Sequence, residues 1–281
     1  AHAIKLQTYT PETMTFNIKK KDFFIKNKKS LWKGSYLFNL YKKAFTPWEW
    51  HKEIFDLAKK NGLLAFSSVF DDTSISFLKK LNNPIFKISS FENTDIELIK
   101  NAALTKKPII ISSGLASLSE LSEAVNIIKK FGNKNFAILK CTSAYPANEK
   151  DINLKTMLDI KKKFNCIVGF SDHTKDIYAA IGSVSQGAQI IEKHVKLDGE
   201  NTVDSKFAIN CGELKKLVDG CNKVYDSVGK IFYGPTKNEL RSLKSRRTLF
   251  FNEDLPKNTT ILSRHIIRAR PGLGLKVNSL K

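Results

Sequence analysis

The sequence predicts an α/β fold in which seven short apolar strands alternate with helices around a parallel sheet. Short runs rich in Ile, Val and Phe recur between longer segments of helical period, the pattern of successive βα units. Polar side chains at nearly every strand exit favour a (β/α)8 barrel, because a barrel gathers those exits at one mouth. No GxGxxG or GxxxxGKS/T motif follows a strand, which weakens the competing open, doubly wound nucleotide-binding sheet.

The elements follow in order along the chain. The first predicted strand spans 3–8, and the aromatic and polar segment 11–45 has no clean period, which predicts a long excursion. Thr46 as N-cap, Pro47 at the first helical position and Glu49 at the third predict a helix that ends near Lys60. The other predicted strands are 63–68, 85–90, 108–112, 136–141, 167–170 and 190–194, and the other predicted helices are 72–81, 94–103, 117–130, 154–164, 175–186 and 214–228.

Bulk composition indicates a soluble, globular protein. The 281 residues allow a barrel-sized core, and the sequence has no apolar run of about 18 residues, so we expect no membrane span. The net charge of +20 comes from lysines spread along the chain, without a nucleic-acid recognition motif, so we expect no nucleic-acid partner. Four scattered cysteines without zinc spacing, and no secretory signal, predict a reducing cytoplasm.

Two histidines mark the stretch 169–194. His173 and His194 each follow a short apolar strand, and a helix between those strands makes one βαβ unit, so both imidazoles lie at the same edge of the sheet. With Asp172 and Glu192 beside them, the pair predicts a divalent-metal site with positions open for substrate. The alternative is a pair of unrelated structural histidines.

Other strand exits carry lysines and hydroxyls. Lys5 and Lys87, with several serines around them, predict a concave site for a phosphate or a carboxylate. After Gly234-Pro235 the pattern changes to that of small β structure with five arginines between Arg246 and Arg270. We therefore predict a barrel domain over 1–235, a linker over 236–245 and a second module over 246–281.

Six motifs carry a resemblance to a known family: TPWEWH, FKISSFE, IIISSG, CTSAYP, GFSDHT and EKHV. With these motifs the chain resembles the sialic-acid synthase family over essentially its whole length. TPWEWH and SFENTD are most similar to the pseudaminic acid synthase branch. The resemblance implies a (β/α)8 TIM barrel followed by a small antifreeze-like domain.

The resemblance implies a metal-dependent transferase that condenses phosphoenolpyruvate with the aldehyde of an N-acetylated amino sugar, here 2,4-diacetamido-2,4,6-trideoxy-L-altrose, and releases phosphate. It implies that His173 and His194 hold the metal, usually Mn²⁺, with Mg²⁺ or Co²⁺ as alternatives, and that Lys87 and Glu92 share the catalytic role. It implies a domain-swapped homodimer in which Arg270 reaches the partner's barrel. The substrate-binding residues that it implies are Lys5, Ser68, Ser90, Ser112, Ser143, Tyr145, Ser171, Asp204 and Arg270.

The chain departs from the family pattern in three places. The family's first strand, with its active-site glutamate, is absent, and Val69 and Val203 replace residues of the family's FSSPF and GGPDS motifs. We therefore expect a barrel that lacks its first βα unit and an incomplete antifreeze-like domain. A barrel without one βα unit has two unpaired strand edges, so we expect residues 1–281 alone to be poorly active or inactive.

Three alternatives stay open from the sequence alone. Within the family, the sugar substrate can be that of an N-acetylneuraminate or legionaminate synthase. From another class, the chain can be a non-catalytic sugar- or anion-binding relic, which metal-dependent phosphate release would exclude. Nucleic-acid binding through the net positive charge is the weakest alternative, and its test is retention of DNA at low ionic strength.

Overall fold

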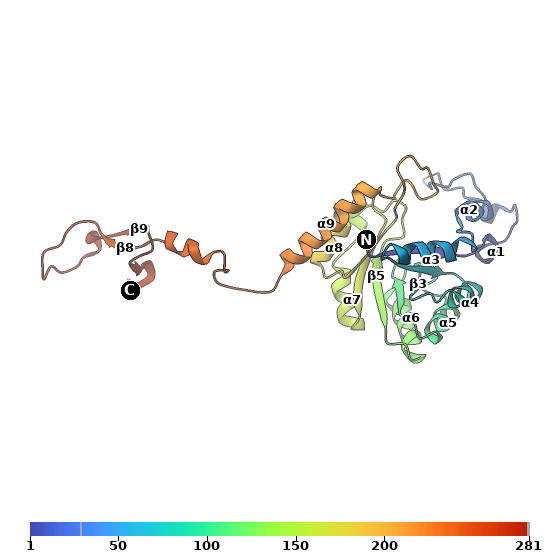
Figure 1. The fold of residues 1–281 in the computed structure, drawn as a ribbon, viewed down its shortest axis with the longest axis horizontal. Helices are drawn as coiled ribbons and strands as arrows, with labels where there is room; N and C mark the ends of the chain where they lie inside the picture. Colours follow the sequence, from blue (N-terminus) through green and yellow to red (C-terminus); the bar gives the residue numbers. More distant parts are fainter. Residues whose placement is uncertain (29, 280–281) are drawn as a thin grey trace. The chain divides into compact units, whose positions relative to one another are not determined.

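The computed structural model describes residues 1–28 and 30–279, which divide into two compact units, 1–228 and 229–281. The first unit holds a parallel sheet and its helices, and the second holds a small antiparallel sheet (Figure 1). The predicted boundaries at 235 and 245 stay predictions of sequence segments, and residues 280 and 281 of the predicted second module lie outside the described residues.

Seven strands of the first unit pair in chain order, each parallel to the next, which confirms the predicted α/β class and parallel sheet. Within the described residues no pairing joins the first strand to the seventh, so the sheet is curled and open rather than a closed ring. The third strand is shorter than predicted and the sixth is longer. The strands are β1 (Ala3–Thr8), β2 (Leu64–Val69), β3 (Phe86–Ile88), β4 (Ile109–Ser112), β5 (Phe136–Cys141), β6 (Ile167–Asp172) and β7 (Ile190–Lys193).

A helix follows or precedes each of these strands, as the alternation predicted. Several begin at side-chain caps: Asp71 accepts hydrogen bonds from the backbone of Thr73 and Ser74, and Ser117 forms a capping box with Glu120. Asn210 and Glu213 cap each other's backbone, so α9 begins earlier than predicted. The helices are α3 (Trp50–Lys60), α4 (Asp72–Lys80), α5 (Ile96–Leu104), α6 (Leu118–Lys130), α7 (Thr156–Phe164), α8 (Tyr178–Ser185) and α9 (Cys211–Val228).

The predicted start of the helix after residue 45 is wrong. Thr46 is not its N-cap and Pro47 is not its first residue, because α3 begins only at Trp50. The Trp48 indole donates to the Tyr9 carbonyl at the end of β1 at 3.1 Å. This tertiary bond accompanies a turn at 48–49 in place of the first helical turn.

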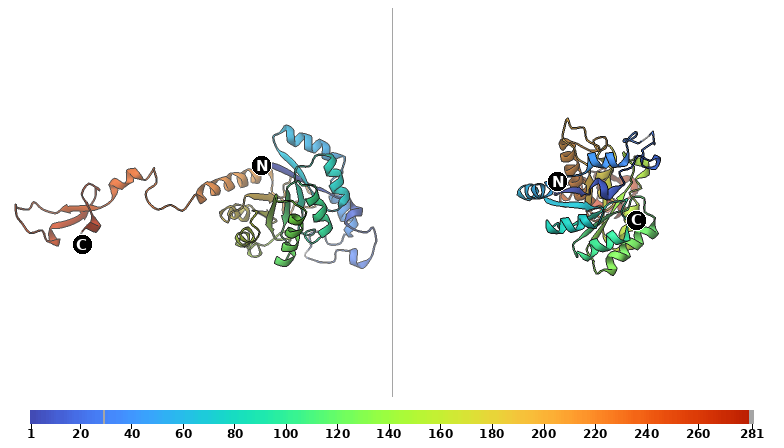
Figure 2. Two further views of the ribbon diagram at one scale, coloured as in Figure 1. Left: turned by 90° about the horizontal axis from the view of Figure 1, so that it is seen from below. Right: turned by 90° about the vertical axis from the view of Figure 1, so that its right-hand side faces the viewer.

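The two faces of the curled sheet have different neighbours. One face, called the outer face here, packs against the helices (Figures 1 and 2). Its buried side chains include Phe86, Ile111, Ile138 and Phe170. The other, called the inner face, holds a small apolar cluster made of strand residues alone: Phe66, Ile110, Ala137 and Leu139. Strand side chains alternate between the faces, so residues two apart share one face.

The segment between β1 and α3 contains more structure than its irregular pattern predicted. It includes α1 (Pro11–Met14), a 3₁₀ turn over Lys21–Phe23 and α2 (Leu37–Ala44), with an isolated bridge between Phe24 and Tyr36. These elements are short and rest on tertiary contacts: the ring of Tyr41 on α2 packs edge-on against the buried Tyr9 at 5.9 Å. Such contacts leave no periodic signal in the sequence.

The second unit is a three-stranded antiparallel sheet. A 3₁₀ helix over Leu240–Ser245 precedes β8 (Thr248–Phe251), β9 (Ile266–Ala269) and β10 (Leu275–Lys276), with β8 in the centre. Thr248 and His265 are its buried polar residues, and Thr248 donates to the Pro271 carbonyl at 2.9 Å. The predicted linker is therefore partly helical. In the described part of the chain, no helix has both the length and the apolar character to cross a membrane.

Candidate active site

The inner face carries a charged network near the carboxyl ends of its strands. Lys5 Nζ lies 3.1 Å from one oxygen of Glu192, and Lys87 Nζ lies 3.9 Å from the other. Ser171 donates to Glu192 at 2.9 Å, and Lys87 donates to Ser112 Oγ at 2.7 Å. Five side chains from five strands thus converge, and four of them are predicted site residues.

The network has more cationic than anionic groups. Burial lowers the pKa of Lys87 to about 8, although the charge of Glu192 opposes this shift. Burial also raises the pKa of Glu192, but Lys5 and Lys87 outweigh it and hold that pKa well below the usual range. One carboxylate therefore faces two lysines. A bound anion would supply the missing negative charge.

Two buried polar atoms near this network have no protein partner within the described residues: Ser68 Oγ and Glu92 Oε2. Ser68 pairs in register with Lys87, so both side chains lie on the inner face. Burial raises the pKa of Glu92 to about 7, although Lys87 opposes the shift. Buried polar atoms normally have partners, so these two atoms indicate a place for a ligand.

Ser90 and Ser143 meet beside Gly114. A Cβ on Gly114 would lie 2.5 Å from Ser90 Oγ and would also clash with Ser143 Oγ. The glycine of the IIISSG motif therefore lets two loop hydroxyls approach each other next to the strand ends. This explains why two predicted substrate-binding serines from separate loops come together.

The two predicted metal ligands are neighbours at the ends of β6 and β7. The ring centroids of His173 and His194 lie 5.4 Å apart. His173 Nδ1 donates to the Thr142 carbonyl at 3.1 Å, and His194 Nδ1 pairs with Asp204 Oδ2 at 3.2 Å. Burial lowers the pKa of His194, which favours the neutral imidazole that binds metals.

This pair fits a divalent cation. Each Nδ1 is held by an oxygen, which leaves Nε2 with the lone pair, as in carboxylate–histidine–metal arrangements. The described residues contain no group of three or more His, Cys, Asp or Glu with metal-binding geometry. His173 and His194 would thus be the protein ligands, and the other positions would go to substrate or water.

The expectation that Asp172 and Glu192 assist the metal is wrong. Glu192 binds the inner-face lysines, and Asp172 lies on the outer face, where its carboxylate meets Lys193 Nζ at 2.8 Å. Glu192 shares the inner face with His194, but it is paired with Lys5 and Lys87. Alternation along β6 puts Asp172 on the opposite face from His173. For the same reason Ser67, which bonds Thr8, belongs to the outer face rather than to the mouth.

Aromatic rings surround the imidazoles. The ring centroid of Tyr145 lies 4.6 Å from that of His173 and 5.2 Å from that of Phe207. The ring centroids of Phe207 and His194 are 4.9 Å apart. Trp32 lies 5.8 Å from Tyr145. Tyr145 is a predicted substrate-binding residue, whereas Phe207 and Trp32 were not predicted, because neither belongs to a periodic segment or a polar strand exit.

Cys141 is a further group that the sequence pattern did not reveal. Its sulfur lies 3.7 Å from His173 Nδ1 and 3.8 Å from Ser143 Oγ. Burial raises the pKa of this thiol, but its hydrogen bond to His173 and the nearby charge outweigh that effect and lower the pKa to about 7. The register of β5 and β6 places it there, because Cys141 pairs with Ser171 on the inner face.

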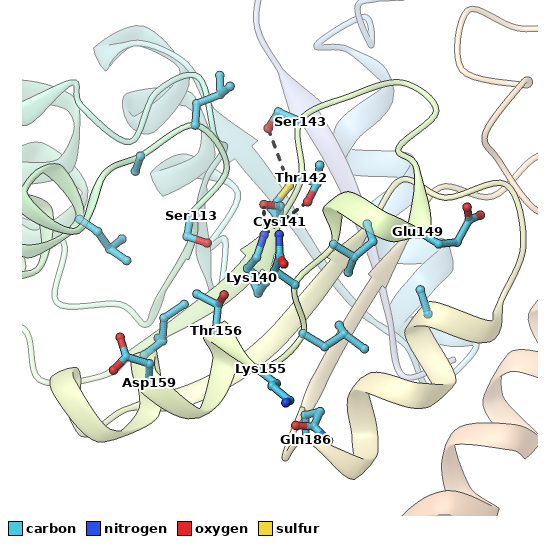
Figure 3. Close-up of a pocket in the computed structure, with 18 of the residues that line it drawn as sticks. Ser113, Lys140, Cys141, Thr142, Ser143, Glu149, Lys155, Thr156, Asp159 and Gln186 are labelled. Atoms are coloured by element: carbon cyan, nitrogen blue, oxygen red, sulfur yellow. Dashed lines mark hydrogen bonds between the residues drawn. The ribbon is translucent and has the colours of Figure 1, made fainter.

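A large groove lies elsewhere in the first unit. It has a volume of about 1260 Å³ and runs between α6, α7, α8 and the loop after β5, lined by Ser113, Lys140, Thr156 and Asp159 among others (Figure 3). Of the predicted site residues it includes Ser143 alone. The histidines, Lys5, Lys87 and Glu192 are absent from its lining, so we assign the active site to the inner-face network and not to this groove.

Arg270 is not part of the first unit, which contains this site. It lies in the second unit, exposed, just after β9. Its predicted role stays a prediction. The structure does bring together Lys5, Lys87, Ser112 and Ser171 in one network, and His173, His194, Asp204 and Tyr145 in an adjacent one.

Residues 1–233 match the family model described as the NeuB family. The chain is 40% identical over 279 residues to a pseudaminic acid synthase of Campylobacter jejuni, covering 98% of this chain and 80% of that protein. It is 39% identical over 279 residues to a pseudaminic acid synthase of Helicobacter pylori, covering 98% and 81%.

A solved structure shares the fold. The crystal structure of an N-acetylneuraminic acid synthetase from Leptospira borgpetersenii, in complex with citrate, superposes with a TM-score of 0.74 at 32% identity. The match covers 86% of this chain and 80% of that chain. A match of that extent includes most of the first unit, which carries the lysine network and the two histidines.

Proposed function

The chain belongs to the NeuB family, and on this basis we propose that it is a pseudaminic acid synthase. In this role it condenses phosphoenolpyruvate with the aldehyde of 2,4-diacetamido-2,4,6-trideoxy-L-altrose and releases inorganic phosphate. The observation that carries the proposal is one carboxylate, Glu192, shared by two lysines beside a pair of imidazoles. It provides an anion site next to a metal site.

The lysines hold phosphoenolpyruvate. Lys5, Lys87 and the hydroxyls of Ser68, Ser112 and Ser171 surround one region of the inner face, so they can pair with phosphate and carboxylate oxygens. The buried position of Lys87 strengthens its attraction for an anion, because water screens the charge less there. Ser68 Oγ, which has no partner among the described residues, gains one when the anion binds.

The reaction joins C3 of phosphoenolpyruvate to the aldehyde carbon of the sugar. Electrons of the C2–C3 double bond form the new bond while the aldehyde oxygen gains a proton. Water then attacks C2, and phosphate leaves as the C2–O bond breaks. Holding both substrates on one inner face makes this step effectively unimolecular, and the lysines stabilise the charge on the departing phosphate.

Glu92 is placed for proton transfer. Its pKa of about 7 lets it hold or release a proton near neutral pH, and its Oε2 has no protein partner within the described residues. His173 and His194 would hold a divalent cation, for which we propose Mn²⁺. That ion supplies Lewis-acid polarisation of the aldehyde oxygen when bound.

We also propose that the second unit is an antifreeze-like domain whose Arg270 enters the barrel of a second copy in a homodimer. In the proposed barrel, β1 to β7 take the places of strands two to eight. The four free cysteines are compatible with a cytoplasmic protein. A test of the dimer is the molecular mass in solution, where a monomeric mass at micromolar concentration would contradict it.

The test of the function is phosphate release from phosphoenolpyruvate with Mn²⁺. In a version restored with a family-type first βα unit, we expect release with 2,4-diacetamido-2,4,6-trideoxy-L-altrose, little with N-acetylmannosamine, and loss of release on chelation of the metal. We expect residues 1–281 alone to release little, so turnover of the chain and its variants is measured in the restored version. Release with N-acetylmannosamine alone would identify a sialic acid synthase instead. Binding of both substrates without release under any metal would identify a non-catalytic binding protein.

A further inference from the structure

Trp32 is joined to the active site by a contact that spans 171 residues of sequence. Its indole Nε1 donates to the carbonyl of Val203 at 3.2 Å. The next residue, Asp204, accepts from His194 Nδ1 at 3.2 Å. The loop that orients one imidazole is therefore tied to the irregular segment between β1 and α3.

The Trp32 ring also extends the aromatic group of Tyr145 and Phe207; these three rings are called the aromatic wall here. It is half-buried and lies 5.8 Å from Tyr145, which in turn contacts His173 and Phe207. Of the three tryptophans in the sequence, Trp48 packs on Phe77 between α3 and α4, and Trp50 is 56% exposed on α3. Trp32 alone among them contacts a residue of the site.

The direction in which the sugar extends follows from the two ends of the site. This inference rests on the proposed function, in which the phosphoenolpyruvate anion lies at Lys5 and Lys87. The aldehyde end of the sugar must therefore approach these lysines. The remaining carbons then extend past the imidazoles toward Tyr145, Phe207 and Trp32. That wall is aromatic, and the Trp32 hydrogen bond is already used by Val203.

We propose that Trp32 is a specificity-determining residue that selects a sugar with an apolar distal end. In the trideoxy sugar that end carries a methyl group and an acetamido group, whereas N-acetylmannosamine carries hydroxyls there. An aromatic face favours methyl and acetamido groups and leaves a hydroxyl without a hydrogen-bond partner. Trp32 thus discriminates between sugars without contacting the reacting atoms.

The test compares Trp32→Ala, Trp32→Phe and the matched control Trp50→Ala in the full chain. The readouts are the dissociation constant of each sugar in the presence of inorganic phosphate, by calorimetry, and kcat/KM for each sugar. We expect Trp32→Ala to weaken the trideoxy sugar roughly tenfold and N-acetylmannosamine less than threefold, in the range of hydrophobic-pocket discrimination. Trp32→Phe keeps most of the preference, because it keeps a ring.

The results distinguish failure of this proposal from failure of the proposed function. If Trp32→Ala weakens the binding of both sugars by the same factor, the proposal is overturned and Trp32 is a structural residue. The same holds if Trp50→Ala weakens the binding of the trideoxy sugar as much as Trp32→Ala does. A wild-type chain that prefers N-acetylmannosamine, or binds neither sugar, would overturn the proposed function itself. A selective loss in Trp32→Ala together with an unchanged midpoint of thermal unfolding supports the proposal.

Discussion

Strands β6 and β7 carry a lysine–carboxylate contact on each of their two faces, and the two contacts differ in nearly every respect. On the outer face, Asp172 and Lys193 form a sealed pair at 2.8 Å, with side-chain exposures of 0% and 2%. On the inner face, Glu192 is 17% exposed and is shared between Lys5 and Lys87.

The difference lies in what remains unsatisfied. Lys193 also donates to the Thr174 carbonyl at 2.6 Å, and Asp172 also accepts from the Thr174 backbone, so the outer pair is complete. The inner group has one more cation than anion and a nearby hydroxyl, Ser68 Oγ, without a partner in the described residues. A complete pair fixes the strands, whereas an incomplete one can bind a ligand.

The largest expected effect follows from breaking the outer pair. Lys193→Met leaves Asp172 buried without its cation, which lowers the free energy of unfolding by about 3–5 kcal/mol. Urea unfolding at pH 7 measures it. The double variant Asp172→Asn/Lys193→Met should recover part of the loss, and Lys52→Met, which breaks an exposed pair with Asp56, should change stability by less than about 1 kcal/mol. A loss in Lys193→Met as small as that of Lys52→Met would contradict the comparison.

Breaking the inner group should affect catalysis rather than folding. Lys87→Met removes a buried cation that faces the proposed phosphate site, and we expect kcat/KM for phosphoenolpyruvate to fall by about 10²–10³-fold. The matched control is Lys140→Met, a half-buried lysine on the outer face that donates to the Cys141 carbonyl. Steady-state phosphate release measures both. Comparable losses in the two variants would show that the inner face has no special role.

Asp204→Asn tests the assignment of the imidazoles. A neutral amide accepts the hydrogen bond of His194 Nδ1 more weakly than the carboxylate does, so His194 becomes a weaker metal ligand. We therefore expect Mn²⁺ affinity to weaken by about 10–100-fold. Electron paramagnetic resonance of free Mn²⁺ measures this without turnover. Asp198→Asn, at an exposed position of the same loop, serves as the control and should leave the affinity unchanged. Unaltered affinity in Asp204→Asn would remove Asp204 from the metal site.

The smallest expected effect concerns pH. Burial raises the pKa of Glu92 from 4.5 to about 7, so the folded state binds this proton more tightly than the unfolded state. Stability should therefore fall as pH rises from about 4.5 to about 7. Glu92→Gln removes this slope and stabilises the protein at pH 8 by about 1 kcal/mol. Unfolding midpoints across this range test it, with exposed Glu97→Gln as the control; an unchanged slope in Glu92→Gln would show that Glu92 is solvated.

Much of the architecture could be predicted from local pattern. Strands such as 109–112 are continuously apolar because both faces of a buried parallel strand are covered. Alternation with helices then gives the parallel order that the structure shows. The start of α3 was misjudged because the indole of Trp48 bonds the Tyr9 carbonyl, a contact between segments 39 residues apart.

The site divides in the same way. The placement of His173, His194, Lys5 and Lys87 at strand ends could be predicted, since parallel strands bring their carboxyl ends to one edge. Which carboxylate meets which lysine could not, because Asp172 and Glu192 look equivalent beside the histidines in the sequence. Their opposite faces depend on the register of β6 and β7.

Residue types and short spacings were enough to predict the alternation of strands and helices, the family and the chemical groups at the strand exits. The arrangement in three dimensions was needed to show that Glu192 joins two lysines, that Asp172 is sealed against Lys193 and that Trp32 reaches Val203. These contacts depend on register, strand alternation and long-range packing, which place side chains in space and which a linear pattern does not contain.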